Sequence, residues 1–189
     1  MPSEEVTKLI SDADQHMVQA IAVLNREYSF IRTGRANPAI LDRVTVEYYG
    51  DHAPIKQMAS IGAPEPRLLT ITPWDKTLIK KITDAITSSD LGLNPISDGN
   101  LIRVPIPQLT TERRKELAKM VLRKAEEGRV AVRNVRRDAV EKLRSLEKRG
   151  AISEDDLHRH QEQVQKLTDS HIEQIAALEK AKEREVMEG

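Results

Sequence analysis

Three long stretches of this chain repeat their apolar residues at helical spacing, and this pattern limits the possible folds more than any other feature. In the first stretch the steps of three and four predict a helix over residues 4–33. A second helix is predicted from Thr110 or Thr111 to Gly150, and a third from a Ser153 N-cap to the end of the chain. Each apolar stripe needs a partner, so together they predict a three-helix bundle.

The segment between the first two helices has another pattern. Most of the nine prolines and five of the eight glycines lie in residues 34–108. Runs of β-branched and aromatic residues predict strands within residues 42–50, 67–74 and 100–109. Residues 75–92 return to helical period. The segment is therefore expected to form a small, turn-rich α/β module.

These elements predict the α+β class, with an elongated three-helix bundle as the main domain, formed by residues 1–33 and 109–189. The small α/β domain, residues 34–108, is inserted into it. Two connections, RTGRANP and VPIPQLT, join the insert to the bundle, and two crossings of one boundary predict a hinge. The candidate hinge residues are Gly34, Arg35, Pro105 and Pro107.

Composition excludes several classes of protein. The chain has no cysteine, which excludes disulfides, thiol catalysis and cysteine-ligated zinc. The N-terminal residues show no secretion or import signal, and no apolar run approaches the ~18 residues of a membrane span. A cytoplasmic protein with no membrane partner is the expectation.

Positive charge is concentrated in one helix. The chain as a whole holds 30 basic and 30 acidic residues. Residues 112–149 hold 14 basic and 7 acidic residues, a net charge of +7, whereas residues 150–189 hold 5 and 10, a net charge of −5. Such local charge is the electrostatic signature of a polyanion-binding surface.

Five arginines share one face of the second helix. On a helical wheel, Arg129, Arg133, Arg136, Arg137 and Arg144 fall within about 100° of one another. The neighbouring side of the wheel is apolar and is expected to face the bundle core. It carries Val121, Ala125, Val132, Val135, Ala139, Leu143 and Leu146.

Two interpretations of this face stay open at the level of residues. An ordinary solvated surface is one, and pairs such as Arg137 with Glu141 and Asp138 with Lys142 would support it. Against it, residues 129–137 contain no acid and use only arginine, whose planar fork binds phosphate. Because no aromatic residue interrupts the run, the alternative is recognition of an RNA backbone and its shape rather than of bases.

Signals of enzymatic chemistry are weak. The sequence contains no glycine-rich phosphate loop, nucleophile elbow or HExxH motif. Asp156 and His160 have the spacing of two metal ligands but are expected to be exposed helix residues, and Asp75 is expected to cap a helix rather than act as a base. Neither a metal site nor a cofactor is expected, and the chain is not expected to be an enzyme.

Four blocks of sequence together resemble the ribosome recycling factor family. In chain order they are IRTGRANPAILDRVTVEYYG, SDLGLNPISDGNLIRVPIPQLTTERRKELAK, RVAVRNVRRDA and ISEDDLHRHQEQVQKLTD. The resemblance covers essentially the whole chain. It implies a three-helix bundle that bears a small α/β domain on a hinge, in an L shape.

The resemblance also implies a function and its partners. The expected partners are the large ribosomal subunit rRNA, the 70S post-termination ribosome and elongation factor G, and the chain is expected to act as a monomer. With elongation factor G and GTP hydrolysis it would split the subunits for reuse, the small domain swinging on the hinge toward the intersubunit bridges. The residues that match the rRNA-contacting arginines of the family are Arg32, Arg129, Arg133 and Arg136.

Small departures from the family pattern occur at Asn37, Ile96 and Thr111, none of which lies on the arginine face. Two other functions compete with the leading hypothesis. A helical adaptor would use its basic face to bind an acidic protein without rRNA. An RNA-processing enzyme would need clustered acids or metal ligands beside the arginines, and the sequence supplies none there.

Overall fold

A computed structural model of the chain describes residues 4–31 and 33–188. The chain packs as two compact units. The first consists of Met1–Tyr28 and Ala118–Arg184, and the second of Ser29–Leu117 and Glu185–Gly189. The second unit therefore takes in residues on both sides of the expected 34–108 insert, including the first turns of the second long helix.

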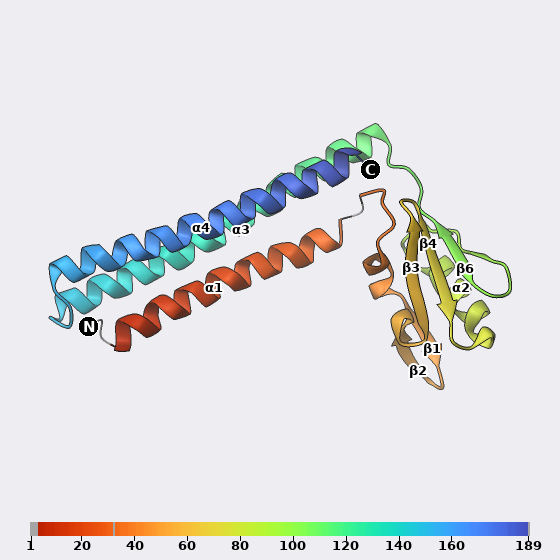
Figure 1. The fold of residues 1–189 in the computed structure, drawn as a ribbon, viewed down its shortest axis with the longest axis horizontal. Helices are drawn as coiled ribbons and strands as arrows, with labels where there is room; N and C mark the ends of the chain where they lie inside the picture. Colours follow the sequence, from red (N-terminus) through yellow and green to blue (C-terminus); the bar gives the residue numbers. More distant parts are fainter. Residues whose placement is uncertain (1–3, 32, 189) are drawn as a thin grey trace. The chain divides into compact units, whose positions relative to one another are not determined.

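Most of three long helices makes up the first unit, and these helices run side by side in Figure 1: α1 (Glu4–Ser29), α3 (Thr111–Lys148) and α4 (Glu154–Glu188). Their apolar stripes meet in a common core, as the helical spacing predicts. Gly128 of α3 sits against Leu24 of α1 and Ile175 of α4. The other fully buried side chains of this core include Val6, Met17, Val121, Val132, Leu143 and Val164.

Local capping determines the ends of α3 and α4. The hydroxyl of Thr110 accepts a hydrogen bond from the backbone N–H of Arg113 (3.1 Å), and that of Ser153 accepts one from Asp156 (3.1 Å). Gly150 has φ 75° and donates its N–H to the carbonyl of Glu147 (2.9 Å), and the N–H of Ala151 donates to the carbonyl of Leu146 (2.9 Å), which together close α3. Thr110, Gly150 and Ser153 are confirmed as helix-end residues.

The first helix is shorter than its periodicity predicts. It ends at Ser29, not at residue 33, and Gly34, with φ 75°, lies five residues beyond the end instead of capping it. Tertiary contacts replace the last turn, because the Phe30 ring stacks under the Arg43 guanidinium, 4.0 Å from the ring centroid. Ile31 is buried there as well.

The α4 stripe is more polar than expected. His160, Thr168 and His171 are buried at helical spacing among apolar residues. Thr168 donates its hydroxyl hydrogen to the carbonyl of Val164 (2.8 Å), and His171 Nε2 lies 2.8 Å from a carboxylate oxygen of Asp14 on α1. Each of the three side chains thus has a hydrogen-bond partner, that of His160 being Gln163, whereas the buried Nδ1 of His171 has none among the described residues.

The second unit contains a four-stranded antiparallel sheet in the order β3-β4-β6-β5. Its strands are β3 (Ala59–Glu65), β4 (Leu68–Pro73), β5 (Ile96–Ser97) and β6 (Ile102–Pro105). The strands expected within residues 67–74 and 100–109 are confirmed, but β3 and β5 were not expected. Gly62 and Pro64 argue against a strand in the sequence, which is why β3 was not predicted. Because β3 is an edge strand, it accommodates both residues.

A separate hairpin pairs β1 (Thr45–Tyr48) with β2 (Asp51–Pro54). Its two turn residues, Tyr49 and Gly50, have φ 48° and 84°, the sign required by a type I′ turn. The strand expected within residues 42–50 is confirmed, and its polar partner β2 was missed.

One helix packs on the sheet of the second unit. Asp75 caps a short 3₁₀ turn (Lys76–Leu78) by accepting a hydrogen bond from the N–H of Thr77, and α2 (Ile79–Ser88) follows at once. Asp75 is therefore a cap, as expected. Buried residues of the helix and the sheet form one core: Leu69, Ile71, Leu78, Ile82, Ile86, Ile102 and Val104.

Candidate nucleic-acid interface

The α3 helix divides its surface between the core and a basic face. Six of the seven residues expected in the apolar stripe are buried, and Val135 is half-buried. On the basic face, Arg133, Arg137 and Arg144 are exposed, while Arg129 and Arg136 are half-buried. The structure therefore places all five arginines outside the core, but they differ in how far they are exposed to solvent.

Arg129 is neutralised by carboxylates of its own chain. Its Nε donates to Glu126 (2.8 Å) and its Nη1 to Glu179 of α4 (2.6 Å). The hydrogen bond to Glu179 and then that to Glu126 raise the pKa of Arg129 above its usual value. Its side chain is only 20% exposed, and that of Glu179 17%. Arg129 therefore links α3 to α4.

Arg133 shares the same acid. Its Nη1 lies 3.2 Å from Glu126, which thus bridges two arginines of the face. Hydrogen bonds from Arg129 and Arg133 lower the pKa of Glu126, although the partial loss of its hydration acts in the opposite direction. The Arg133 side chain is 45% exposed, so a ligand can compete for it with a solvated carboxylate.

Arg136 has a neutral partner. Its Nη1 donates to the amide oxygen of Gln165 on α4 (3.2 Å), and the Gln165 amide nitrogen donates in turn to Asp169 (2.8 Å). An amide orients the guanidinium without cancelling its charge. Because no carboxylate of residues 4–31 and 33–188 pairs with Arg136, its guanidinium is presented to solvent in a defined direction and keeps its charge.

Sequence reasoning missed the acids of this face. Glu126 precedes Arg129 by three residues, and side chains at this spacing meet on a helix surface. The pair of Glu126 with Arg129 could therefore have been predicted from the sequence. Glu179 and Gln165 lie on another helix, and no local signal reveals them. The pairs of Arg137 with Glu141 and of Asp138 with Lys142, which would have supported an ordinary solvated face, do not form among residues 4–31 and 33–188.

A polar groove follows this face between α3 and α4. It has a volume of about 360 Å³. Arg136, Arg137 and Arg144 line its α3 side, and Gln161 and Gln165 its α4 side.

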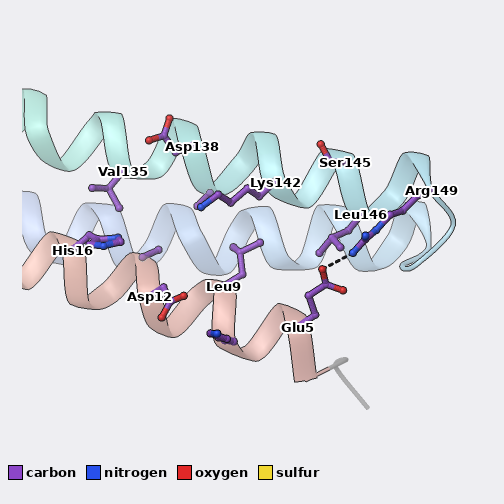
Figure 2. Close-up of a pocket in the computed structure, with 13 residues that line it drawn as sticks. Glu5, Leu9, Asp12, His16, Val135, Asp138, Lys142, Ser145, Leu146 and Arg149 are labelled. Carbon is purple, nitrogen blue, oxygen red and sulfur yellow. Dashed lines mark hydrogen bonds and ion pairs between the residues drawn. The ribbon is translucent and has the colours of Figure 1, made fainter.

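A second groove, between α1 and α3, has a different character. It measures about 470 Å³, and Leu9, Val135 and Leu146 line it beneath charged residues of both signs. Figure 2 shows Glu5 of α1 joined to Arg149 of α3 across this groove. Its lining holds three acids, Glu5, Asp12 and Asp138, and three bases, Lys8, Lys142 and Arg149, so it has no excess of positive charge from lysine and arginine to attract an anion.

The remaining candidate residues that the structure describes lie in the second unit. Arg32 falls outside the described residues. Gly34 has the left-handed φ, and Arg35 lies 3.7 Å from Glu188. Pro105 ends β6, opposite Leu68 of β4. All four candidate hinge residues belong to the second unit: Gly34, Arg35, Pro105 and Pro107. Their role as a hinge stays a prediction.

The weak metal signal gains no support. His160 Nδ1 lies 2.8 Å from the Gln163 amide oxygen, and Asp156 pairs with Arg159. No three His, Asp or Glu side chains of the described ranges are arranged to hold a metal ion. Nor does any helix within those ranges combine the length and apolarity of a membrane span.

The departures from the family pattern have local roles. Asn37 caps a 3₁₀ turn (Pro38–Arg43) by accepting a hydrogen bond from the N–H of Ala39 (3.0 Å). Thr111 begins α3, and Ile96 is an exposed residue of the short edge strand β5.

Comparison with known proteins gives one consistent result. The family model described as "Ribosome recycling factor" matches residues 24–187. The ribosome-recycling factor of Rubrobacter xylanophilus is 56% identical over 179 residues, covering 95% of this chain and 96% of that protein. That of Bacillus subtilis is 54% identical over 181 residues, covering 96% and 98%.

Solved structures agree. A solution structure of the ribosome recycling factor superposes with a TM-score of 0.78 at 41% identity, covering 98% of this chain and 99% of that one. A second match has a TM-score of 0.68 at 45% identity, covering 96% and 98%. It is described as models for the T. thermophilus ribosome recycling factor and the E. coli elongation factor G bound to the E. coli post-termination complex.

Proposed function

The chain belongs to the ribosome recycling factor family, and from this premise we propose how its own residues serve that function. It is a translation factor that acts on the post-termination ribosome with elongation factor G. Driven by GTP hydrolysis on that partner, it promotes dissociation into subunits and release from mRNA. The chain works as a cytoplasmic monomer, without a cofactor and without catalysing a reaction itself.

The basic face of α3 is the surface that binds rRNA of the large subunit. The observation that carries this assignment is the Arg136 guanidinium, oriented by a neutral amide and left positively charged at the surface. Fixed, uncompensated guanidinium groups suit phosphate oxygens, and helix α3 offers no aromatic side chain among these arginines for base stacking. Arg32, Arg129 and Arg133 complete the rRNA-binding set, Arg129 contributing least because two carboxylates already neutralise it.

The two domains predicted from the sequence divide the work. The bundle, residues 1–33 and 109–189, anchors the protein on rRNA, and the α/β domain, residues 34–108, is the part that elongation factor G displaces. The hinge lies at Gly34, Arg35, Pro105 and Pro107. Support comes from the left-handed backbone of Gly34 and from prolines that limit the paths open to the second connection.

The test is binding to purified large ribosomal subunits across a salt series. Wild type should bind with affinity that falls steeply as salt rises, because phosphate-bound counterions are released. Arg136→Ala should bind more weakly by roughly 1.5–3 kcal/mol, the range for a hydrogen bond to a charged group, and should melt nearly as wild type. Wild-type affinity in a folded Arg136→Ala protein would refute the assignment.

An adaptor that binds an acidic protein is the competing function. The same subunits, stripped of their acidic ribosomal proteins, separate the two. Binding that survives this treatment supports the rRNA assignment, and binding that disappears supports the adaptor.

A further inference from the structure

The polar groove between α3 and α4 lies beside the arginines assigned above but is built from two helices. Its α3 side carries Arg137 and Arg144 in addition to Arg136. From α4 it receives the amide side chains of Gln161 and Gln165, which are neutral donors and acceptors. An anion entering the groove would thus meet groups of both helices.

The groove has an excess of positive charge. Three guanidinium groups line it against a single carboxylate, that of Glu141. Arg137 and Arg144 are exposed and have no hydrogen-bond or ion-pair partner in the part of the chain that the structure describes. Their donors are therefore available, in contrast to those of Arg129, which two carboxylates occupy.

The dimensions suit a small hydrated anion. The groove, about 360 Å³ in volume, has room for a phosphate group together with water molecules. A phosphodiester group with part of its hydration shell fits such a space. Guanidinium and amide N–H groups are the donors that phosphate oxygens accept from most often in nucleic-acid complexes.

We propose that this groove binds a backbone phosphate of the RNA that the α3 face contacts. The interface then extends past the α3 stripe onto α4, with Arg137, Arg144 and Gln161 as additional binding residues. Gln165 has a positioning role, since it holds the Arg136 guanidinium at the edge of the groove. The inference rests on the proposed function, because it takes rRNA as the ligand.

The experiment compares two charge changes on one helix. Arg144→Gln removes a groove cation, and Arg149→Gln removes a cation five residues away, in the α1–α3 groove of Figure 2. Both proteins are titrated with large ribosomal subunits across a salt series, and both are melted. Arg144→Gln should bind about 3- to 10-fold more weakly at 0.15 M salt, with the salt slope reduced by about 0.9 for the lost phosphate contact.

Two further variants separate charge from geometry. Arg144→Lys should keep the wild-type salt slope while losing part of the affinity, because lysine retains the charge but not the planar fork. Gln161→Ala should weaken binding about 2- to 5-fold with an unchanged slope, since it removes a neutral hydrogen bond. Arg149→Gln should bind with wild-type affinity and slope.

Several outcomes would overturn the inference. Equal effects of Arg144→Gln and Arg149→Gln would mean that only net charge matters. Wild-type binding of Arg144→Gln, beside weak binding of Arg136→Ala, would reject the groove and leave the α3 face standing. Wild-type binding of Arg136→Ala, or loss of all binding on subunits stripped of acidic proteins, would reject the proposed function itself.

Discussion

Tyr28 and Arg129 show how the surroundings of single residues set what each can do. The Tyr28 ring is buried, and its hydroxyl donates to the carbonyl of Val121 on α3 (2.8 Å). Burial, and then the negative charge of Glu179, raise the pKa of Tyr28 from 10.0 to about 12. Glu179 of α4 also pairs with Arg129 of α3. The charges of both residues act on Tyr28 of α1, so Arg129 of the basic face belongs to a junction of all three helices.

Tyr28→Phe tests this junction. The variant loses one hydrogen bond to a buried carbonyl, so its free energy of unfolding at pH 7 should fall by about 0.5–1.5 kcal/mol. Between pH 10 and about 12 the unfolded chain ionises Tyr28 while the folded protein keeps its proton, so wild type loses stability as pH rises. Tyr28→Phe has no hydroxyl to ionise, so its stability does not fall for this reason.

Urea unfolding of both proteins at pH 7, 9 and 11 measures the effect. The stability difference between them should be complete below pH 10 and should shrink at pH 11. A difference that stays constant over this range would show that Tyr28 ionises equally in both states.

Among the elements, helix α3 has two roles: one side packs in the core of the bundle, and the other is the face proposed to bind rRNA. Gly128 lies on its packing side, in the middle of the helix, where glycine costs about 0.5–1 kcal/mol relative to alanine. A Cβ atom at this position would lie 3.5 Å from Ile175 and 3.6 Å from Leu24, which is ordinary van der Waals contact. The position therefore has room for one methyl group.

Gly128→Ala should raise the free energy of unfolding by about 0.5–1 kcal/mol, because it removes backbone freedom from the unfolded chain and fills space without a clash. Gly128→Val is the matched control and should destabilise, since two further methyl groups do not fit that space. Thermal and urea unfolding measure both. Destabilisation by alanine would mean that the three helices need to approach more closely than their contacts indicate.

For the whole molecule, recycling requires that binding and splitting be separable, and the proposed hinge supplies the means. Gly34 has φ 75°, a backbone conformation that costs most side chains about 1–2 kcal/mol. Gly150, in the turn between α3 and α4, has the same φ of 75° but lies within the bundle. The two glycines form a matched pair for testing the hinge.

Gly34→Val should impair subunit splitting more than binding to the large subunit, because a β-branched residue restricts the backbone at the proposed hinge. Gly150→Val should lower the melting temperature to a similar degree and leave the ratio of splitting to binding unchanged. Light scattering with elongation factor G and GTP follows splitting, and sedimentation follows binding. Equal losses of both activities in Gly34→Val would refute the hinge.

Much of the fold was determined locally and could be predicted from the sequence. Apolar spacing located three long helices, and cap residues such as Thr110, Gly150 and Ser153 marked their ends. These signals act over one or two turns, so they survive without tertiary context. The arginine run of α3 was likewise visible, because residues on one helix face recur at fixed spacing.

Tertiary structure decided what local spacing cannot encode. It ended α1 at Ser29, paired the polar β2 and the proline-bearing β3, and buried two histidines in α4. Above all it differentiated the arginines: Glu179, 50 residues from Arg129, neutralises one, and Gln165, 29 residues from Arg136, only orients another. The physical reason is that these partners meet only when α3 and α4 pack in one register, which depends on the whole core.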